Sequence, residues 1–186
     1  MNQPPTSAPE PATRRTPSVV IVNTGDGKGK TTAAMGVVLR SLSRGWKVCV
    51  IQFVKSGRWH TGEVRLLSEL GAQWHIMGDG FTWVVDDLDH SAQLAAAAWE
   101  VARDAISSGE FNLVLLDEVT YPIKWGWIDE ADVIATISNR LPKVNVILTG
   151  RDASPGVIEI ADTVSEVRKI KHAYDAGIRA AKGIDF

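Results

Sequence analysis

Short apolar runs recur along the chain and alternate with longer stretches in which apolar residues return with the period of a helix. The short runs are rich in Val, Ile and Leu, which is typical of strands buried on both faces of a sheet. We expect strands at 18–23, 46–53, 73–77, 111–116, 144–148 and 163–167. We expect a helix of about fourteen residues that ends before Gly45, and further helices at 63–70, 88–108, 129–139 and 156–161.

This alternation of strand and helix predicts an α/β fold, with a mostly parallel sheet and helices on both of its faces. In such sheets, ligands bind at the carboxyl ends of the strands. Three polar segments fall at predicted strand ends: the Gly-rich stretch 24–32, Asp117-Glu118 and Thr149-Gly150-Arg151. The sequence therefore predicts a single domain over residues 18–186, with its notable polar residues where a ligand is expected.

Length and composition exclude several classes of protein. The chain has 186 residues, which suits one domain, and 20 Lys and Arg against 22 Asp and Glu leave a formal charge of −2. No global basic field is thus available to hold nucleic acid, and no run approaches the roughly 20 apolar residues that span a bilayer. Cys49 is the only cysteine and lies in an apolar run. We expect it to be a buried strand residue, with no internal disulfide and a reducing, cytoplasmic compartment.

The first 17 residues differ from the remainder. Five of the eight prolines fall there, and the segment lacks the apolar core of a secretory signal. We expect residues 1–17 to form a disordered or loosely attached arm. Alternatively, part of this arm becomes ordered over an active site when a ligand binds.

The stretch Thr24-Gly25-Asp26-Gly27-Lys28-Gly29-Lys30-Thr31-Thr32 follows a predicted buried strand and precedes a helix. Its glycines let backbone N–H groups turn inward around phosphate oxygens, and the helix N-terminus adds partial positive charge. In such a phosphate-binding loop, or P-loop, Lys30 can reach the outer phosphates and the Thr31 hydroxyl can bind Mg²⁺. The usual pattern begins with Gly rather than Thr24. Length and context nevertheless favour ATP binding by 25–32 over a Gly-rich turn without a ligand.

Asp117 and Glu118 directly follow four apolar residues of a predicted strand. A carboxylate at this strand end can hold Mg²⁺, directly or through water, beside Thr31. Together with the loop, the acidic pair predicts a P-loop NTPase fold of the RecA-like type. In many ATP hydrolases a Glu beside the strand-end Asp orients water, so Glu118 alone does not separate hydrolysis from another reaction. An Asp that merely caps a turn is the structural alternative.

Aromatic residues are common in the predicted loops. Phe81 and Trp83 stand two apart in a segment flanked by glycines and acids. The chain has seven tryptophans, and several lie in or beside predicted loops: Trp59, Trp83, Trp125 and Trp127. A large, flat, apolar ligand would explain such aromatics, and packing into the core is the alternative.

These motifs occur with three further segments in one combination. Its parts are 24–36 (TGDGKGKTTAAMG), Gln52-Phe53-Val54-Lys55, Gly80-Phe81-Thr82-Trp83, Leu116-Asp117-Glu118, Thr149-Gly150-Arg151, Lys171-His172 and Gly183-Ile184-Asp185-Phe186. The combination resembles the P-loop class of corrinoid adenosyltransferases, which act on cob(I)alamin or cob(I)yrinic acid a,c-diamide. The resemblance covers nearly everything after residue 17. The P-loop alone is not specific, whereas its combination with GFTW and the C-terminal segment is.

The resemblance implies a reaction. The 5′-deoxyadenosyl group of ATP would pass to the cobalt of a reduced corrinoid, with Mg²⁺ present and release of tripolyphosphate. Co(I) is already a strong nucleophile, so no general base is needed, which suits a chain without an obvious Ser/His/Asp or Cys/His set. The family's nucleotide lies reversed in the loop, so that C5′ rather than the γ-phosphate is presented. A homodimer and an electron donor, flavodoxin-like or a flavin reductant, are also implied.

The resemblance also implies roles for individual residues. Lys30, Arg40 and Glu118 would be catalytic, and Thr31 and Glu118 would bind the metal with Asp117 beside them. Arg40 matches a family arginine near the phosphates; the alternative is a surface cation on a helix.

The corrinoid side of the site would involve the aromatic pair. Phe81 and Trp83 would face the corrin and help to expel its lower axial ligand, which makes Co(II) easier to reduce. For His172 we expect a packing or polar role, because a His on the cobalt would oppose the four-coordinate state.

Three rival functions use the same loop. They are a RecA-like ATPase that drives a partner protein, a small-molecule kinase acting at the γ-phosphate, and a nucleotide-gated binding module. The products separate them, since hydrolysis and kinase action yield ADP.

Overall fold

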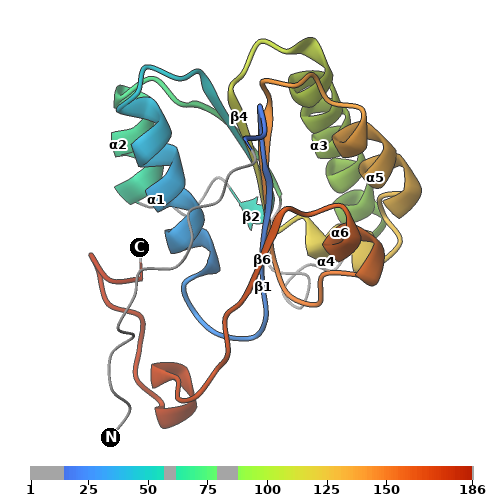
Figure 1. Ribbon diagram of the computed structural model, residues 1–186. Coiled ribbons are helices and arrows are strands. Elements are labelled where there is room, and N and C mark those ends of the chain that lie inside the picture. The colour runs from blue at the N-terminus through green and yellow to red at the C-terminus, as the bar shows by residue number, and fades with distance from the viewer. Residues whose placement is uncertain (1–14, 57–61, 79–87, 186) are drawn as a thin grey trace, which may run out of the picture.

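The computed structural model describes residues 15–56, 62–78 and 88–185, and a six-stranded parallel sheet forms its centre (Figure 1). The strands lie in the order β3-β2-β4-β5-β1-β6, and each neighbouring pair is parallel. Their bounds are Val20–Thr24 (β1), Val48–Ser56 (β2), Gln73–Gly78 (β3), Leu113–Asp117 (β4), Asn145–Thr149 (β5) and Thr163–Glu166 (β6). The predicted α/β class with a mostly parallel sheet is confirmed.

Helices cover both faces of the sheet, with α1 and α2 on one side and α3 and α5 on the other (Figure 1). The helices are Lys30–Leu42 (α1), Gly62–Glu69 (α2), Leu88–Ser108 (α3), Thr120–Lys124 (α4), Glu130–Ser138 (α5) and Pro155–Glu159 (α6), followed by the 3₁₀ helix η1 at Ala173–Ala176. None of the helices in the described part of the chain has the length and apolar character needed to cross a membrane.

The core has two layers because successive side chains of a strand point to opposite faces of the sheet. In β4, Val114 and Leu116 belong to the cluster under α3 and α5, whereas Leu113 and Leu115 belong to the cluster under α1. Each of these four residues is at most 1% exposed. Cys49 of β2 lies in the same core, as expected, and burial raises the pKa of its thiol to about 12.

The predicted strands and helices lie where elements are observed, with bounds that differ by a few residues; β2, predicted at 46–53, runs from Val48 to Ser56. The long Ala-rich helix was predicted at 88–108, where α3 is found. α4 and η1 were not predicted, because segments of five and four residues show little helical period. α6 is as short as α4, but the alternation of strands and helices predicted a helix there, at 156–161.

Strand order brings the predicted polar segments together. β5 lies between β4 and β1, and it pairs with both in parallel. The loop after β1, the acids at the end of β4 and the Thr-Gly-Arg segment at the end of β5 therefore meet at one edge of the sheet.

Candidate active site

The loop between β1 and α1 depends on backbone conformations that glycine adopts readily. Gly25 has a φ of 94° and Gly29, the N-cap residue of α1, has a φ of 119°. Both values lie in the left-handed region, where a side chain would be strained. The chain can therefore turn sharply after the buried strand and direct its N–H groups and the N-terminus of α1 to one place.

Lys30 is the first residue of α1, and its ammonium group lies inside this loop. Its Nζ donates to the carbonyl oxygens of Gly25 at 2.6 Å and Gly27 at 2.8 Å, and the residue is only 8% exposed. Burial lowers the pKa of Lys30 from 10.5, and the nearby Arg151 cation lowers it further, while Glu118 and Asp26 act in the opposite direction. A buried cation held by neutral carbonyls is well suited to an anionic ligand.

The segment after β6 packs directly on the loop. The N–H of Gly27 donates to the carbonyl oxygen of Val167 at 2.6 Å. A Cβ on Gly27 would lie 2.7 Å from that oxygen and 2.8 Å from the carbonyl oxygen of Arg168. Further along the C-terminal segment, Asp185 pairs with Lys28 at 2.6 Å. Glycine at position 27 is therefore required by this close approach of two backbones.

Asp117 is the buried centre of the site. Its carboxylate is fully buried and accepts hydrogen bonds from Thr31 Oγ1 and Thr149 Oγ1, each at 2.8 Å, and from Gln52 Nε2 at 2.9 Å. Burial of a carboxylate is costly unless donors surround it. These three contacts join β2, β5 and α1 to the end of β4, so the predicted proximity of Asp117 and Thr31 is confirmed. No role for Gln52 was predicted from the sequence, and the structure places it as a hydrogen-bond donor to Asp117.

Glu118 follows with a left-handed backbone, φ 65°, which is uncommon for a residue other than glycine. Its N–H donates to Thr149 Oγ1 at 2.9 Å. Strained backbone of this kind is concentrated at functional sites. One threonine hydroxyl thus positions both acidic residues.

An aromatic row begins just after this strained residue. The ring of Tyr121 stacks on Trp125 with centroids 5.4 Å apart, and Trp125 lies 4.7 Å from Trp127. Burial raises the pKa of Tyr121 to about 12, with Glu118 adding to the effect, so its phenol stays neutral at physiological pH. Trp125 is 37% exposed. The row provides a partly exposed stacking surface after the end of β4.

Other predicted residues lie farther from the loop or outside the described residues. Arg40 is exposed in the last turn of α1, ten residues after Lys30, which is about 15 Å along a helix. The structure of this chain does not bring it to the loop, and its role stays a prediction. Phe81 and Trp83 lie outside the described residues. His172 caps η1 by accepting the N–H of Tyr174 at Nδ1, which is a polar role of the expected kind.

The residues of this site offer oxygen ligands for a cation without forming a closed cage. Within the described ranges, no group of three or more His, Cys, Asp or Glu side chains could hold a metal ion. Thr31 Oγ1 and Asp117 Oδ1 are adjacent beside the loop. Hydroxyl and carboxylate oxygens suit Mg²⁺, which takes few protein ligands when phosphates and water supply the others.

Comparison with known proteins gives consistent matches. Residues 16–186 match the family described as ATP:corrinoid adenosyltransferase BtuR/CobO/CobP. Over 168 residues the chain is 40% identical to the corrinoid adenosyltransferase of Escherichia coli (strain K12), covering 90% of this chain and 85% of the relative. It is 42% identical over 170 residues to the corrinoid adenosyltransferase of Pseudomonas aeruginosa, covering 90% and 83%. It is 39% identical over 168 residues to the corrinoid adenosyltransferase CobA of Salmonella typhimurium, covering 90% and 85%.

Proposed function

Because the chain belongs to the ATP:corrinoid adenosyltransferase family, we propose that it transfers the 5′-deoxyadenosyl group of ATP to a reduced corrinoid and releases tripolyphosphate. The proposed acceptor is cob(I)alamin or cob(I)yrinic acid a,c-diamide. The observation that carries the proposal is the buried Lys30 ammonium inside a Gly-rich loop, beside the Thr31–Asp117 pair. This arrangement can hold a triphosphate, and the family match supports a corrinoid as the acceptor.

In this reaction the protein has to position the two reacting atoms and stabilise the charge of the leaving group. Co(I) supplies the electron pair that forms the bond to C5′, while the C5′–O5′ bond breaks and its electrons leave with the tripolyphosphate. No proton has to be removed from the nucleophile. Holding C5′ in line with cobalt can lower the activation free energy by roughly 7–11 kcal/mol.

The leaving group develops negative charge, and the loop faces it with donors. Phosphate oxygens would replace the carbonyl oxygens of Gly25 and Gly27 as partners of the Lys30 ammonium. The N-terminus of α1 adds its partial positive charge. Such fixed donors stabilise developing charge without reorganising during the reaction.

Thr31 and Asp117 would hold Mg²⁺, with Glu118 binding it directly or through water. The bound cation would neutralise charge on the phosphates. Gln52 and Thr149 hold the Asp117 carboxylate in a fixed orientation, so its oxygen faces Thr31 rather than turning away.

The remaining parts of the proposal come from the family resemblance. Phe81 and Trp83 would contact the corrin and favour loss of its lower axial ligand. An electron donor, flavodoxin-like or a flavin reductant, would supply Co(I). The working protein would be a cytoplasmic homodimer.

The deciding experiment supplies ATP, Mg²⁺ and chemically reduced corrinoid, and it follows absorbance together with the phosphate product. We expect tripolyphosphate and a light-sensitive cobalt–carbon bond. ADP as the sole product would instead indicate an ATPase or a kinase acting at the γ-phosphate. Lys30→Ala should abolish turnover. Lys47→Ala is the matched control, because Lys47 lies beyond the amino end of β2 with a side chain that is 67% exposed.

A further inference from the structure

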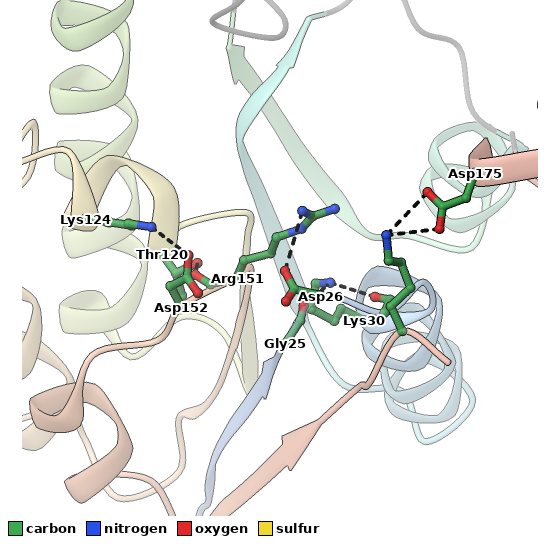
Figure 2. Close-up of polar contacts among 10 residues, drawn as sticks. Gly25, Asp26, Lys30, Thr120, Lys124, Arg151, Asp152 and Asp175 are labelled. Carbon is green, nitrogen blue, oxygen red and sulfur yellow. Dashed lines mark hydrogen bonds and ion pairs between the residues drawn. The ribbon is translucent and has the colours of Figure 1, made fainter. Parts of the chain in front are cut away.

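A second cation, Arg151, faces the phosphate loop from the end of β5. Its Nη1 lies 3.6 Å from Oδ1 of Asp26, and the two side chains are 50% and 69% exposed. Figure 2 shows the Arg151 side chain between Thr120 and the loop residue Asp26. The guanidinium therefore lies beside the loop that encloses the Lys30 ammonium.

The backbone that carries this side chain is fixed on two sides. Thr120 Oγ1 donates to the carbonyl oxygen of Arg151 at 2.7 Å, and the N–H of Gly150 donates to that of Asn23 at 3.3 Å. Gly150 has a φ of 139°, and a Cβ there would lie 2.0 Å from Thr120 Oγ1. A fixed backbone with an exposed head group positions the guanidinium without burying it.

The residue after Arg151 is also constrained. Asp152 has a left-handed φ of 54°, and its carboxylate pairs with Lys124 at 2.7 Å. This pair ties the segment to the end of α4. Uncommon backbone conformations persist only where the surroundings impose them, and they are concentrated at functional sites.

The charges around the loop favour replacement of the Asp26 carboxylate by phosphate oxygens as the partner of Arg151. Burial lowers the pKa of Lys30 most, and repulsion from the Arg151 cation also lowers it, against the opposite effect of Glu118. A triphosphate carries several negative charges and can satisfy both cations at once. An exposed ion pair such as Asp26–Arg151 contributes little stability, so phosphate oxygens can displace the carboxylate. The planar guanidinium also matches phosphate oxygens in a two-pronged contact that a lysine does not provide.

We propose that Arg151 binds the triphosphate of ATP directly, and that Asp26 holds its guanidinium until phosphate oxygens replace the carboxylate. The inference rests on the proposed function in taking ATP as the ligand of this loop. As the tripolyphosphate leaves, Arg151 adds a second positive charge to that of the Lys30 ammonium.

The test is calorimetric binding of MgATP and, separately, of magnesium tripolyphosphate, without corrinoid. Loss of a charge-assisted hydrogen bond should raise the Kd of Arg151→Gln roughly 10–100-fold for both ligands. Arg151→Lys should lie between this variant and the parent. Arg44→Gln is the matched control, because Arg44 is exposed just beyond the end of α1 that is distant from the loop.

The outcomes separate this inference from the proposed function. Unchanged affinity of Arg151→Gln for both ligands, with an unfolding midpoint like that of the parent, would overturn it. Because no acceptor is present, the binding result stands whatever product the transfer assay yields. A variant that only disturbed folding would lower the unfolding midpoint, and Arg151→Lys then supplies the decisive comparison.

A double-mutant cycle tests the part played by Asp26. Asp26→Asn should tighten tripolyphosphate binding several-fold in the parent, because it removes both a repelling charge and the partner that competes for Arg151. In the Arg151→Gln background only the repulsion remains to be relieved, so the gain should be smaller. Equal gains in the two backgrounds would refute the exchange of partners.

Discussion

Replacing Thr149 with Val should destabilise the fold and misalign the two acidic residues, because one hydroxyl connects both. Thr149 is fully buried, donates to Asp117 and accepts from the N–H of Glu118. Valine has nearly the same shape, but it removes the hydrogen-bond donor to Asp117 and the acceptor for the N–H of Glu118. A hydrogen bond to a charged group contributes about 1.5–3 kcal/mol, and removing the partner of a buried donor costs about 1–3 kcal/mol. The two losses share one hydroxyl and are not additive, so we expect about 2–4 kcal/mol.

Urea unfolding followed by circular dichroism measures this loss, with Thr149→Ser as the matched control. Serine keeps the hydroxyl and loses one methyl group, which should cost about 1 kcal/mol. With a urea dependence of about 2 kcal/mol per molar, the middle of the usual range, the Val midpoint should fall by about 1–2 M. Adenosyl transfer should be lost in the Val variant and retained in the Ser variant. A Val variant that unfolds at the same urea concentration as the Ser variant would refute the reasoning.

Three further predictions concern the loop and the acceptor. Gly27→Ala should weaken ATP binding at least tenfold by calorimetry, because its Cβ would press on the C-terminal backbone, whereas Gly36→Ala, with open space around its Cβ, should bind normally. Because burial lowers the pKa of Lys30 from 10.5, its charge is complete below that lowered value and is lost as pH rises through it. The affinity for tripolyphosphate should therefore fall at a lower pH than it would with a lysine of ordinary pKa. A fall centred at or above pH 10.5 would contradict this prediction. Phe81→Ala and Trp83→Ala should slow transfer most when cobalt starts as Co(II) with its lower ligand attached, and an equal loss with pre-reduced substrate would contradict their role.

The elements most readily predicted were those whose pattern is local and long. The 21 residues of α3 repeat their apolar positions over several turns, and its predicted bounds match those observed. The strands are short but strongly apolar, since the central ones are buried on both faces. α4 shows neither pattern, and it begins beside the strained Glu118, where tertiary contacts rather than propensity set the backbone.

The sequence by itself was enough to predict which segments form the candidate site. The P-loop is contiguous from residue 24 to 32, and the acids follow an unmistakable apolar strand, so local spacing was enough to indicate a triphosphate and a cation. It also indicated the edge of the sheet where they meet, because parallel strands carry their ligands at their carboxyl ends.

Only the tertiary structure decided which of these residues touch. Thr31 and Asp117 are 86 positions apart in the sequence, and Thr149 and Asp117 are 32 apart. Both threonines nevertheless donate to Asp117, because β5 lies between β4 and β1. The two arginines show the same dependence. The family resemblance implied a role near the phosphates for Arg40 and none for Arg151, yet the rise of α1 carries Arg40 away from the loop. Strand order brings Arg151 to within 3.6 Å of Asp26. Contacts between distant segments depend on strand order and packing, which no local pattern of residues specifies.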